Sequence, residues 1–162
     1  MHMFSLKGKD NIDLKKKEDL TMKVRDIMTK DVSYVTTGSN ITNAADIMKS
    51  LNVGIVPVCD NNQTPVGVIT DRDIVLRSVA GNNTNQNVEN VMSGNIVSVS
   101  PDTDAHEAAS LMAQNQIRRL PVVENNKIVG MLSLGDLANV NIHVDEAGQA
   151  LSSISKPGNE MK

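Results

Sequence analysis

Two short segments of this chain pair a hydroxyl with a carboxylate at the same spacing. Thr70 and Asp73 are three positions apart, and so are Ser133 and Asp136. Each hydroxyl ends a predicted strand, and each aspartate falls in the first turn of a helix, where free backbone N–H groups attract anions. An ionised aspartate only accepts hydrogen bonds and can take both hydroxyls of a ribose. The spacing therefore predicts a sugar-phosphate site at each of these two strand-to-helix corners.

The same spacing also has a purely structural explanation. Thr70, Asp71 or Ser133 can cap the helix that follows, and acidic residues are common in first turns. For one corner considered alone, capping is the simpler interpretation. The hydroxyl and the aspartate are kept at both corners although the residues between them differ, and this favours a ligand.

Arginines distinguish the two corners and their neighbours. Arg118 and Arg119 precede the Leu-Pro-Val stretch of the second half, where the first half has glycine and isoleucine. Arg72 lies inside the first corner, and glycine takes its place in the second. Guanidinium groups bind phosphate through paired hydrogen bonds, so we expect unequal sites, a charged one with Asp73 and a less charged one with Asp136. The alternative for the arginine pair is solvated surface charge, with or without pairing to Asp71 or Glu124.

Other candidate sites are weak. The histidines have no second ligand at metal-binding spacing, so no metal site is expected; they are His2, His106 and His143. Cys59 lies in an apolar stretch without a flanking base and is expected to pack in the core. No glycine loop ends in Gly-Lys-Ser or Gly-Lys-Thr, which excludes a P-loop.

The elements that hold these residues come from an internal repeat. At an offset of 64, ten of the 39 positions from 24 to 62 are identical to their counterparts, nearly all of them apolar or turn residues. After one deleted residue the offset becomes 63, and it aligns the Thr70 corner with the Ser133 corner. Such self-similarity is typical of a duplicated supersecondary unit.

Each copy has the order strand, helix, strand, strand, helix. Apolar residues at i, i+3, i+4 and i+7 predict the first helix of each copy, and β-branched runs predict the strands. Ser39 or Asn40, and a residue of 102–104, are expected to cap the first helices. The predicted strands are 32–36, 53–59 and 65–70, then 96–100, 117–123 and 127–133; the predicted helices are 41–48, 71–79, 105–112 and 134–140.

One copy alone leaves a sheet face open, so we expect the two copies to pack together. The predicted fold class is α+β, with two tandem β-α-β-β-α repeats, pseudo-two-fold symmetry and equivalent clefts between the repeats. The ends are expected to be mobile extensions or short packing arms. The predicted parts are an N-terminal extension at 1–21, repeats at 22–80 and 88–142, a polar linker at 81–87 and a C-terminal tail at 143–162.

Composition removes several functional classes. The 162 residues are 40% hydrophobic, with a formal net charge of -3, as in an ordinary globular domain. A net acidic chain is not expected to bind nucleic acid, and with only Phe4 and Tyr34 as aromatics it has no stacking platform for a base. No stretch resembles a membrane span or a signal peptide, and there is one cysteine, so the cytoplasm is the expected compartment.

The paired motifs resemble a known family. The stretch from Asn52 to Val58 with the Asp73 corner, and the stretch from Gln116 to Val122 with the Asp136 corner, are similar to a tandem pair of cystathionine-β-synthase (CBS) domains. Such a pair is also called a Bateman module, and this one looks like a stand-alone bacterial-type CBS domain protein. The resemblance covers about residues 22–142.

The resemblance implies a regulatory sensor of AMP, ADP, ATP or sometimes S-adenosylmethionine, bound between the repeats. It also implies a homodimer that acts on an unknown effector protein in trans, with no catalysis and no required cofactor. Asp73 and Asp136 would hold the ribose hydroxyls, and Thr70 and Ser133 the phosphate or the ribose edge. The adenine would lie largely against backbone groups around Val32, Val56, Pro57, Ile96, Leu120 and Pro121.

Two other functions stay open. One is a structural, partner-binding scaffold whose clefts bind no ligand. The other is a small nucleotide hydrolase, which would need a general base near a bound phosphate, with Asp71, Asp73 and Asp136 as the candidates.

Overall fold

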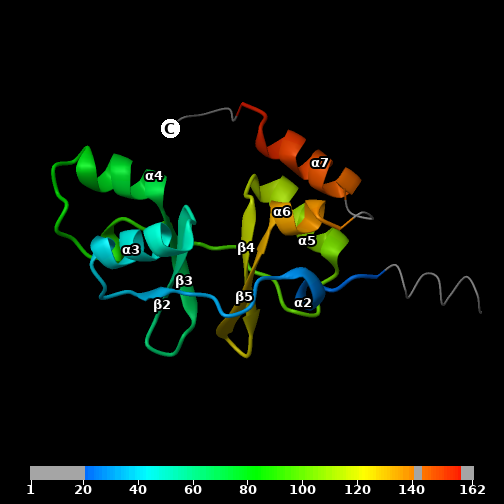
Figure 1. The fold of residues 1–162 in the computed structure, drawn as a ribbon, viewed down its shortest axis with the longest axis horizontal. Helices are drawn as coiled ribbons and strands as arrows, with labels where there is room; N and C mark the ends of the chain where they lie inside the picture. The colour runs from blue at the N-terminus through cyan, green and yellow to red at the C-terminus, as the bar shows by residue number, and fades with distance from the viewer. Residues whose placement is uncertain (1–20, 141–143, 158–162) are drawn as a thin grey trace, which may run out of the picture.

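Two halves lie side by side in the computed structural model, which describes residues 21–140 and 144–157 (Figure 1). The helical segments are α2 (Val24–Ile27), α3 (Ile41–Leu51), α4 (Asp71–Asp73), the π-helical η2 (Ile74–Val79), the 3₁₀-helical η3 (Val88–Asn90), α5 (Ala105–Asn115), α6 (Leu134–Ala138) and α7 (Val144–Ile154). The strands are β1 (Val35–Thr36), β2 (Ile55–Cys59), β3 (Pro65–Thr70), β4 (Arg119–Glu124) and β5 (Lys127–Ser133). The predicted α+β fold class with two tandem repeats is confirmed.

The two halves pair their strands in the same way. In the first half, β1 runs parallel to β2, and β2 pairs antiparallel with β3. In the second half, β4 and β5 pair antiparallel, and the counterpart of β1 is one parallel bridge from Val99 to Val122. The strands predicted at 32–36 and 96–100 are thus shorter than expected. Of these two runs only Val35 and Val99 are buried, so few side chains hold the backbone against the sheet.

The amphipathic helices α3 and α5 begin at predicted caps. The Asn40 side chain accepts a hydrogen bond from Thr42 N at 3.0 Å, and the Asp104 side chain accepts one from His106 N at 2.8 Å. Both helices run three residues beyond their predicted ends and stop at a residue in the left-handed conformation. Their apolar faces contribute to the two hydrophobic cores.

The start of each repeat packs on the other half of the molecule. Val24 of α2 belongs to the core of the second half, whereas Val88 and Val91, in and after η3, belong to the core of the first. Figure 1 shows α2 beside the second half, near β5 and α5. The predicted boundaries at 22–80 and 88–142 follow the sequence repeat. Each packed core is built from both repeats, because the first segment of each repeat, which contains α2 or η3, packs on the half formed by the other repeat. We call these two the exchanged segments.

Two glycines let the exchanged segments come close to the sheets. Ser93 pairs with β3 through backbone hydrogen bonds of 2.9 and 3.0 Å, and Thr29 pairs with β5 through bonds of 2.8 and 3.0 Å. A Cβ atom on Gly67 would lie 2.7 Å from the Ser93 carbonyl oxygen, and one on Gly130 would lie 3.0 Å from the Thr29 carbonyl oxygen. A side chain at either glycine would therefore push the exchanged segment away.

The C-terminal helix α7 covers one side of the second half. It lies against α5 and α6 and buries Ala147 and Ala150 in the second core (Figure 1). From the sequence, the tail at 143–162 is expected to be either a mobile extension or a packing arm. In the structure, α7 packs on the second half as such an arm. The extension predicted at 1–21 lies outside the described residues, apart from Thr21.

The helix predicted at 71–79 is a short α4 that continues as η2. Ser78 is fully buried and donates its hydroxyl to the Asn83 carbonyl oxygen at 2.6 Å, which fixes the end of η2. The outer face of η2 carries exposed apolar side chains, Val75, Leu76 and Val79. In the part of the chain that the structure describes, no helix has the length and apolar character needed to cross a bilayer.

Candidate functional site

Both strand-to-helix corners form reciprocal caps. Thr70 Oγ1 accepts a hydrogen bond from Asp73 N at 3.0 Å, and Asp73 Oδ2 accepts one from Thr70 N at 3.0 Å. At the second corner, Ser133 Oγ accepts from Asp136 N at 3.1 Å, and Asp136 Oδ2 accepts from Ser133 N at 2.7 Å. This is the capping-box arrangement, so the structural explanation of the spacing is confirmed at both corners. It fixes each hydroxyl and leaves the Oδ1 atom of each carboxylate outside the cap.

Each corner is also tied to the start of the neighbouring strand. The Asp71 N–H donates to the Gly54 carbonyl oxygen at 3.0 Å, and the Leu134 N–H donates to the Arg118 carbonyl oxygen at 2.9 Å. These bonds are equivalent in the two repeats. The second one holds Arg118 beside the Ser133 corner.

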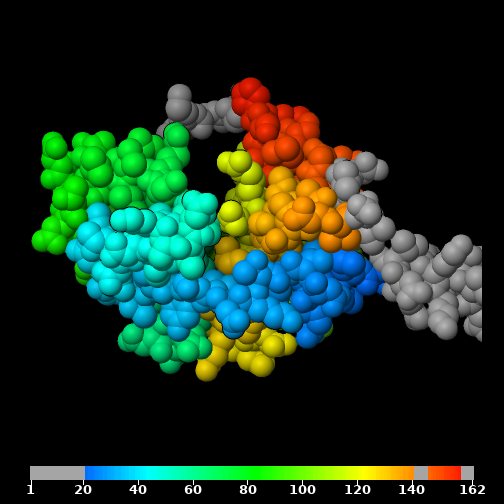
Figure 2. Space-filling view, in the orientation of Figure 1, coloured from blue at the N-terminus to red at the C-terminus, as the bar shows by residue number. Residues whose placement is uncertain are grey.

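A cleft of about 1200 Å³ lies between the two halves and reaches both corners. Figure 2 shows the hollow between the green surface of α4 and η2 and the yellow-to-red surface of β4 and α7. The two corners, the starts of β2 and β4, the stretch 93–97 and part of α7 line it. The cleft is thus bounded by both repeats, as the predicted architecture requires.

Seven of the predicted ligand residues line this cleft. They are Thr70, Arg72, Ile96, Arg118, Arg119, Pro121 and Ser133. The corner hydroxyls and the arginines therefore share one cavity, although they come from different repeats.

The other predicted ligand residues do not line the cleft. Asp73 and Asp136 are partly buried, and each accepts a hydrogen bond from the backbone N–H of its corner hydroxyl residue. Val56 and Leu120 belong to the two hydrophobic cores and are almost completely buried. Pro57 is also buried, and Val32 is half-buried outside the cleft. The roles expected of these six residues as ligand contacts stay predictions.

The two repeats contribute different residues to the cleft. Ile96 and Pro121 line it, whereas their counterparts at an offset of 64, Val32 and Pro57, do not. The cavity therefore contains Ile96 and Pro121 of the predicted adenine residues of the second repeat, and none of those of the first.

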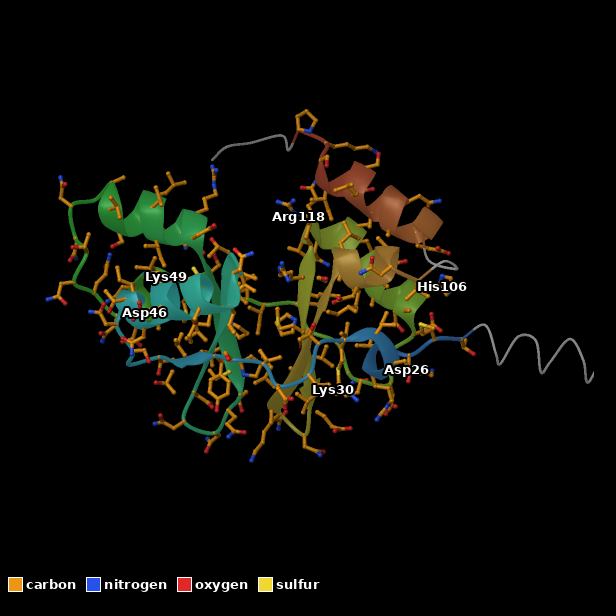
Figure 3. All side chains as sticks on the ribbon, in the orientation of Figure 1. Asp26, Lys30, Asp46, Lys49, His106 and Arg118 are labelled. Atoms are coloured by element: carbon orange, nitrogen blue, oxygen red, sulfur yellow. The ribbon has the colours of Figure 1, made fainter. Side chains whose placement is uncertain are left out.

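The charge of the cleft is positive. Its ionisable lining residues are three arginines and one aspartate, in a chain with a formal net charge of -3. The aspartate is Asp71, whose Oδ1 accepts a hydrogen bond from Arg72 N at 2.7 Å. Within the described residues, Arg72, Arg118 and Arg119 form no side-chain hydrogen bond or ion pair, and Figure 3 shows Arg118 at the cleft end of β4. Arg118 and Arg119 are both exposed, which agrees with the alternative of solvated surface charge, but neither pairs with Asp71 or Glu124 in the described residues.

The first corner has an additional arginine that the second lacks. Arg77 Nη1 lies 3.6 Å from Asp73 Oδ1 and donates to the Val91 and Met92 carbonyl oxygens at 2.8 and 3.2 Å. At an offset of 63, the second repeat has Val140 in this position. Arg77 thus links the Asp73 carboxylate, whose side chain is only 12% exposed, to the exchanged segment that leads into the cleft.

Sequence reasoning missed most of two walls of the cleft. In the stretch 93–97 it named only Ile96, from the family resemblance, because no other residue type in this stretch suggests a ligand. The other wall is α7, which contributes Gly148 and Leu151. The helical spacing of Val144, Ala147, Leu151 and Ile154 in the sequence is a signal that could have identified this helix.

Comparison with known proteins identifies the family. The CBS domain model matches residues 24–79 and 88–143. The CBS domain-containing protein YhcV of Bacillus subtilis is 44% identical to this chain over 133 residues, which cover 82% of this chain and 94% of YhcV.

Solved structures of CBS pairs have the same fold. The CBS domain pair of protein MJ0100, in complex with 5′-methylthioadenosine and S-adenosyl-L-methionine, has a TM-score of 0.66 and 27% identity, covering 74% of this chain and 94% of that one. CBSX2 in complex with AMP has a TM-score of 0.65 and 27% identity, covering 76% of this chain and 98% of that one. With two family matches in tandem, this chain belongs to the CBS domain family.

Proposed function

We propose that this chain is a regulatory module that binds an adenosine-containing ligand in the inter-repeat cleft. The observation that carries the proposal is the shared cavity, in which Thr70, Ser133 and the unpaired arginines meet the second repeat's predicted adenine wall. The ligands of the two solved CBS pairs, AMP in one and S-adenosyl-L-methionine in the other, support the adenosine class.

The lining residues suggest a role for each part of such a ligand. Adenine lies against Ile96 and Pro121, where backbone and aliphatic groups replace an aromatic platform. The hydroxyls of Thr70 and Ser133 and the arginines receive the ribose edge and the phosphate groups. Asp73 and Asp136 stay the predicted ribose ligands, through the Oδ1 atoms that the caps leave unused.

The proposed mechanism is a population shift. A ligand that touches both repeats binds one relative arrangement of the halves better than another and favours it by the difference in affinity. The exposed face of η2, next to the first corner, carries the change to a second copy of the chain and to an effector protein in trans. The chain itself catalyses no reaction in this proposal.

Calorimetric titration of the full chain with AMP, ADP, ATP and S-adenosylmethionine tests the proposal. Ile96→Asp puts a carboxylate on the adenine wall and should abolish binding of the ligand that wild type binds. Val32→Asp makes the same change at the equivalent position of the first repeat, outside the cleft, and so separates the two predicted adenine positions. Circular dichroism checks that both variants fold.

Three outcomes contradict the proposal. No heat with any of the four ligands would leave the scaffold interpretation. Sustained phosphate release that Asp71→Ala abolishes would favour a hydrolase. Loss of binding in Val32→Asp, with binding retained in Ile96→Asp, would move the site to the other repeat.

A further inference from the structure

We infer that the cleft selects ligands with a chain of two or three phosphoryl groups over monophosphates and over sulfonium compounds. This inference rests on the proposed function and adds the chemical class of the ligand. It depends on the number, the placement and the unpaired state of the arginines in the cleft.

The first step is the charge balance. Arg72, Arg118 and Arg119 face one carboxylate, Asp71, among the ionisable residues that line the cleft. A body with more acidic than basic residues thus concentrates positive charge at this place. Since the three guanidiniums have no ion-pair partner in the described residues, their charge is left for a ligand.

The second step is where the cations stand. Arg72 belongs to the first corner, next to Thr70, whereas the Arg118 backbone is hydrogen-bonded to Leu134 N in the second corner at 2.9 Å. The two corners come from different repeats and share one cavity. A di- or triphosphate chain carries more oxygens and extends farther than a single phosphate, so it can contact more of these cations. A ligand that contacted the cations of both corners would also bridge the halves.

The third step is exclusion of the alternative adenosine ligand. S-adenosylmethionine carries a sulfonium and an ammonium against one carboxylate, so its net charge is positive. A net positive ligand is repelled by unpaired guanidiniums. Each added phosphoryl group has the opposite effect, because guanidinium binds phosphate oxygens in pairs.

The test is calorimetric titration of the full chain with AMP, ADP, ATP and S-adenosylmethionine, and with inorganic tripolyphosphate as a probe without adenosine. ATP is expected to bind roughly tenfold or more tightly than AMP, since one further charge-assisted contact is worth about that factor. S-adenosylmethionine should bind more weakly than AMP. Added salt should weaken ATP binding more than AMP binding.

Single variants assign the selectivity to the arginines. Arg72→Gln, Arg118→Gln and Arg119→Gln should each narrow the ratio of ATP to AMP affinity by roughly threefold to tenfold. Arg25→Gln is the matched control, because Arg25 pairs with Asp102 outside the cleft. The ratio of ATP affinity to AMP affinity in this variant should equal that of wild type.

The outcomes separate this inference from the proposed function. Equal affinity for AMP and ATP, or tightest binding of S-adenosylmethionine, overturns the inference and leaves the adenosine-binding module standing. Binding of tripolyphosphate without any adenosine ligand supports the phosphate selectivity and overturns the proposed function. An unchanged ATP to AMP ratio in all three cleft variants also overturns the inference.

Discussion

At the residue scale, the corner hydroxyls have two roles at once. Thr70 and Ser133 cap the helices that follow them, and both line the cleft. A cap and a ligand contact are compatible because a hydroxyl oxygen has two lone pairs and a rotatable proton. The capping box therefore does not argue against ligand binding, and it fixes the oxygen where the ligand would meet it.

Removing the first of these hydroxyls should lower stability and affinity together. Thr70→Ala loses the hydrogen bond to Asp73 N, and the free energy of unfolding should fall by about 1 kcal/mol. Affinity for the ligand should fall by roughly threefold to tenfold. Urea unfolding and calorimetry measure the two effects, and Thr70→Ser should restore both. If Thr70→Ala kept wild-type stability and wild-type affinity, Thr70 would have neither the capping role nor the ligand-binding role.

Cys59 is buried in β2, and the sequence-based prediction that it packs in the core is confirmed. Burial, with a smaller contribution from Asp60, raises the pKa of the Cys59 thiol from 9.0 to about 11. Near neutral pH its thiolate fraction is then roughly a hundredth of that of a free thiol. A disulfide reagent should label the native chain far more slowly than the chain in denaturant. Equal rates would show that Cys59 is accessible.

The same pKa shift makes stability depend on alkaline pH. The native chain keeps the Cys59 proton up to about pH 11, whereas the unfolded chain releases it above pH 9.0. Stability from this group is therefore fully present below pH 9.0 and falls as the pH rises from 9.0 towards 11. Urea midpoints across this range should fall more steeply for wild type than for Cys59→Val. Parallel curves would contradict the assignment.

At the scale of the elements, the exchange of first segments makes each core depend on both repeats. Gly67 and Gly130 are equivalent positions at which β3 and β5 meet the exchanged segment of the other repeat. Packing of this kind cannot be relieved by moving one side chain when the close neighbour is backbone. The two glycines are therefore needed because the exchanged segment packs closely against the strand, and not because a turn requires them.

Alanine at these glycines should destabilise the chain in a defined order. Gly67→Ala should cost about 1–3 kcal/mol of unfolding free energy, because its Cβ would meet the Ser93 carbonyl at 2.7 Å. Gly130→Ala should cost less, since its closest neighbour is the flexible Met28 side chain and the Thr29 carbonyl is 3.0 Å away. Gly38→Ala, with nothing within 4 Å, should be nearly neutral. Thermal unfolding ranks the three, and equal costs would contradict the exchanged packing.

The sequence predicts elements better than it predicts their partners. The strands at 65–70 and 127–133 match β3 and β5 because β-branched runs and a terminal hydroxyl mark them locally. The exchange was not predictable from the repeat. The offset of 64 aligns Val24 with Val88, but this alignment is the same whether each valine packs in the core of its own half or of the other half. For the cleft, the hydroxyls and arginines could be found from their types. Of the 93–97 wall only Ile96 could be named, from the family resemblance, because the exchange that brings this stretch to the cleft leaves no signal in the sequence.

At the scale of the whole molecule, the cleft lies where the pseudo-symmetry is broken. The second half has its α5 and α6 surface covered by α7, and the cleft uses Ile96 and Pro121 of the same repeat. No helix of the described residues covers the equivalent surface of the first half, formed by α3 and η2. A duplicated unit has thus become two unequal halves, one lining most of the cleft and one with an open apolar face.

This apolar face should be where two copies of the chain meet. Leu51 of α3 and Val75, Leu76 and Val79 of η2 are all more than half exposed. Exposed apolar side chains such as these favour burial against a partner. We expect wild type to sediment as a dimer and Val75→Asp with Leu76→Asp as a monomer, because paired carboxylates cannot be buried there. Ala45→Asp, on the exposed side of α3, should stay dimeric.

A dimer formed through this apolar face would also link ligand binding to self-association. If η2 carries the ligand signal, the ligand must change the dimerisation constant, and by linkage the dimer must bind the ligand with a different affinity from the monomer. Titrating the Val75→Asp, Leu76→Asp variant with the ligand that wild type binds should therefore give a shifted affinity, although neither residue lines the cleft. If the variant and wild type bound the ligand with identical affinity, dimerisation through this face would be independent of ligand binding in the cleft. A monomeric wild type would remove the face from the mechanism altogether.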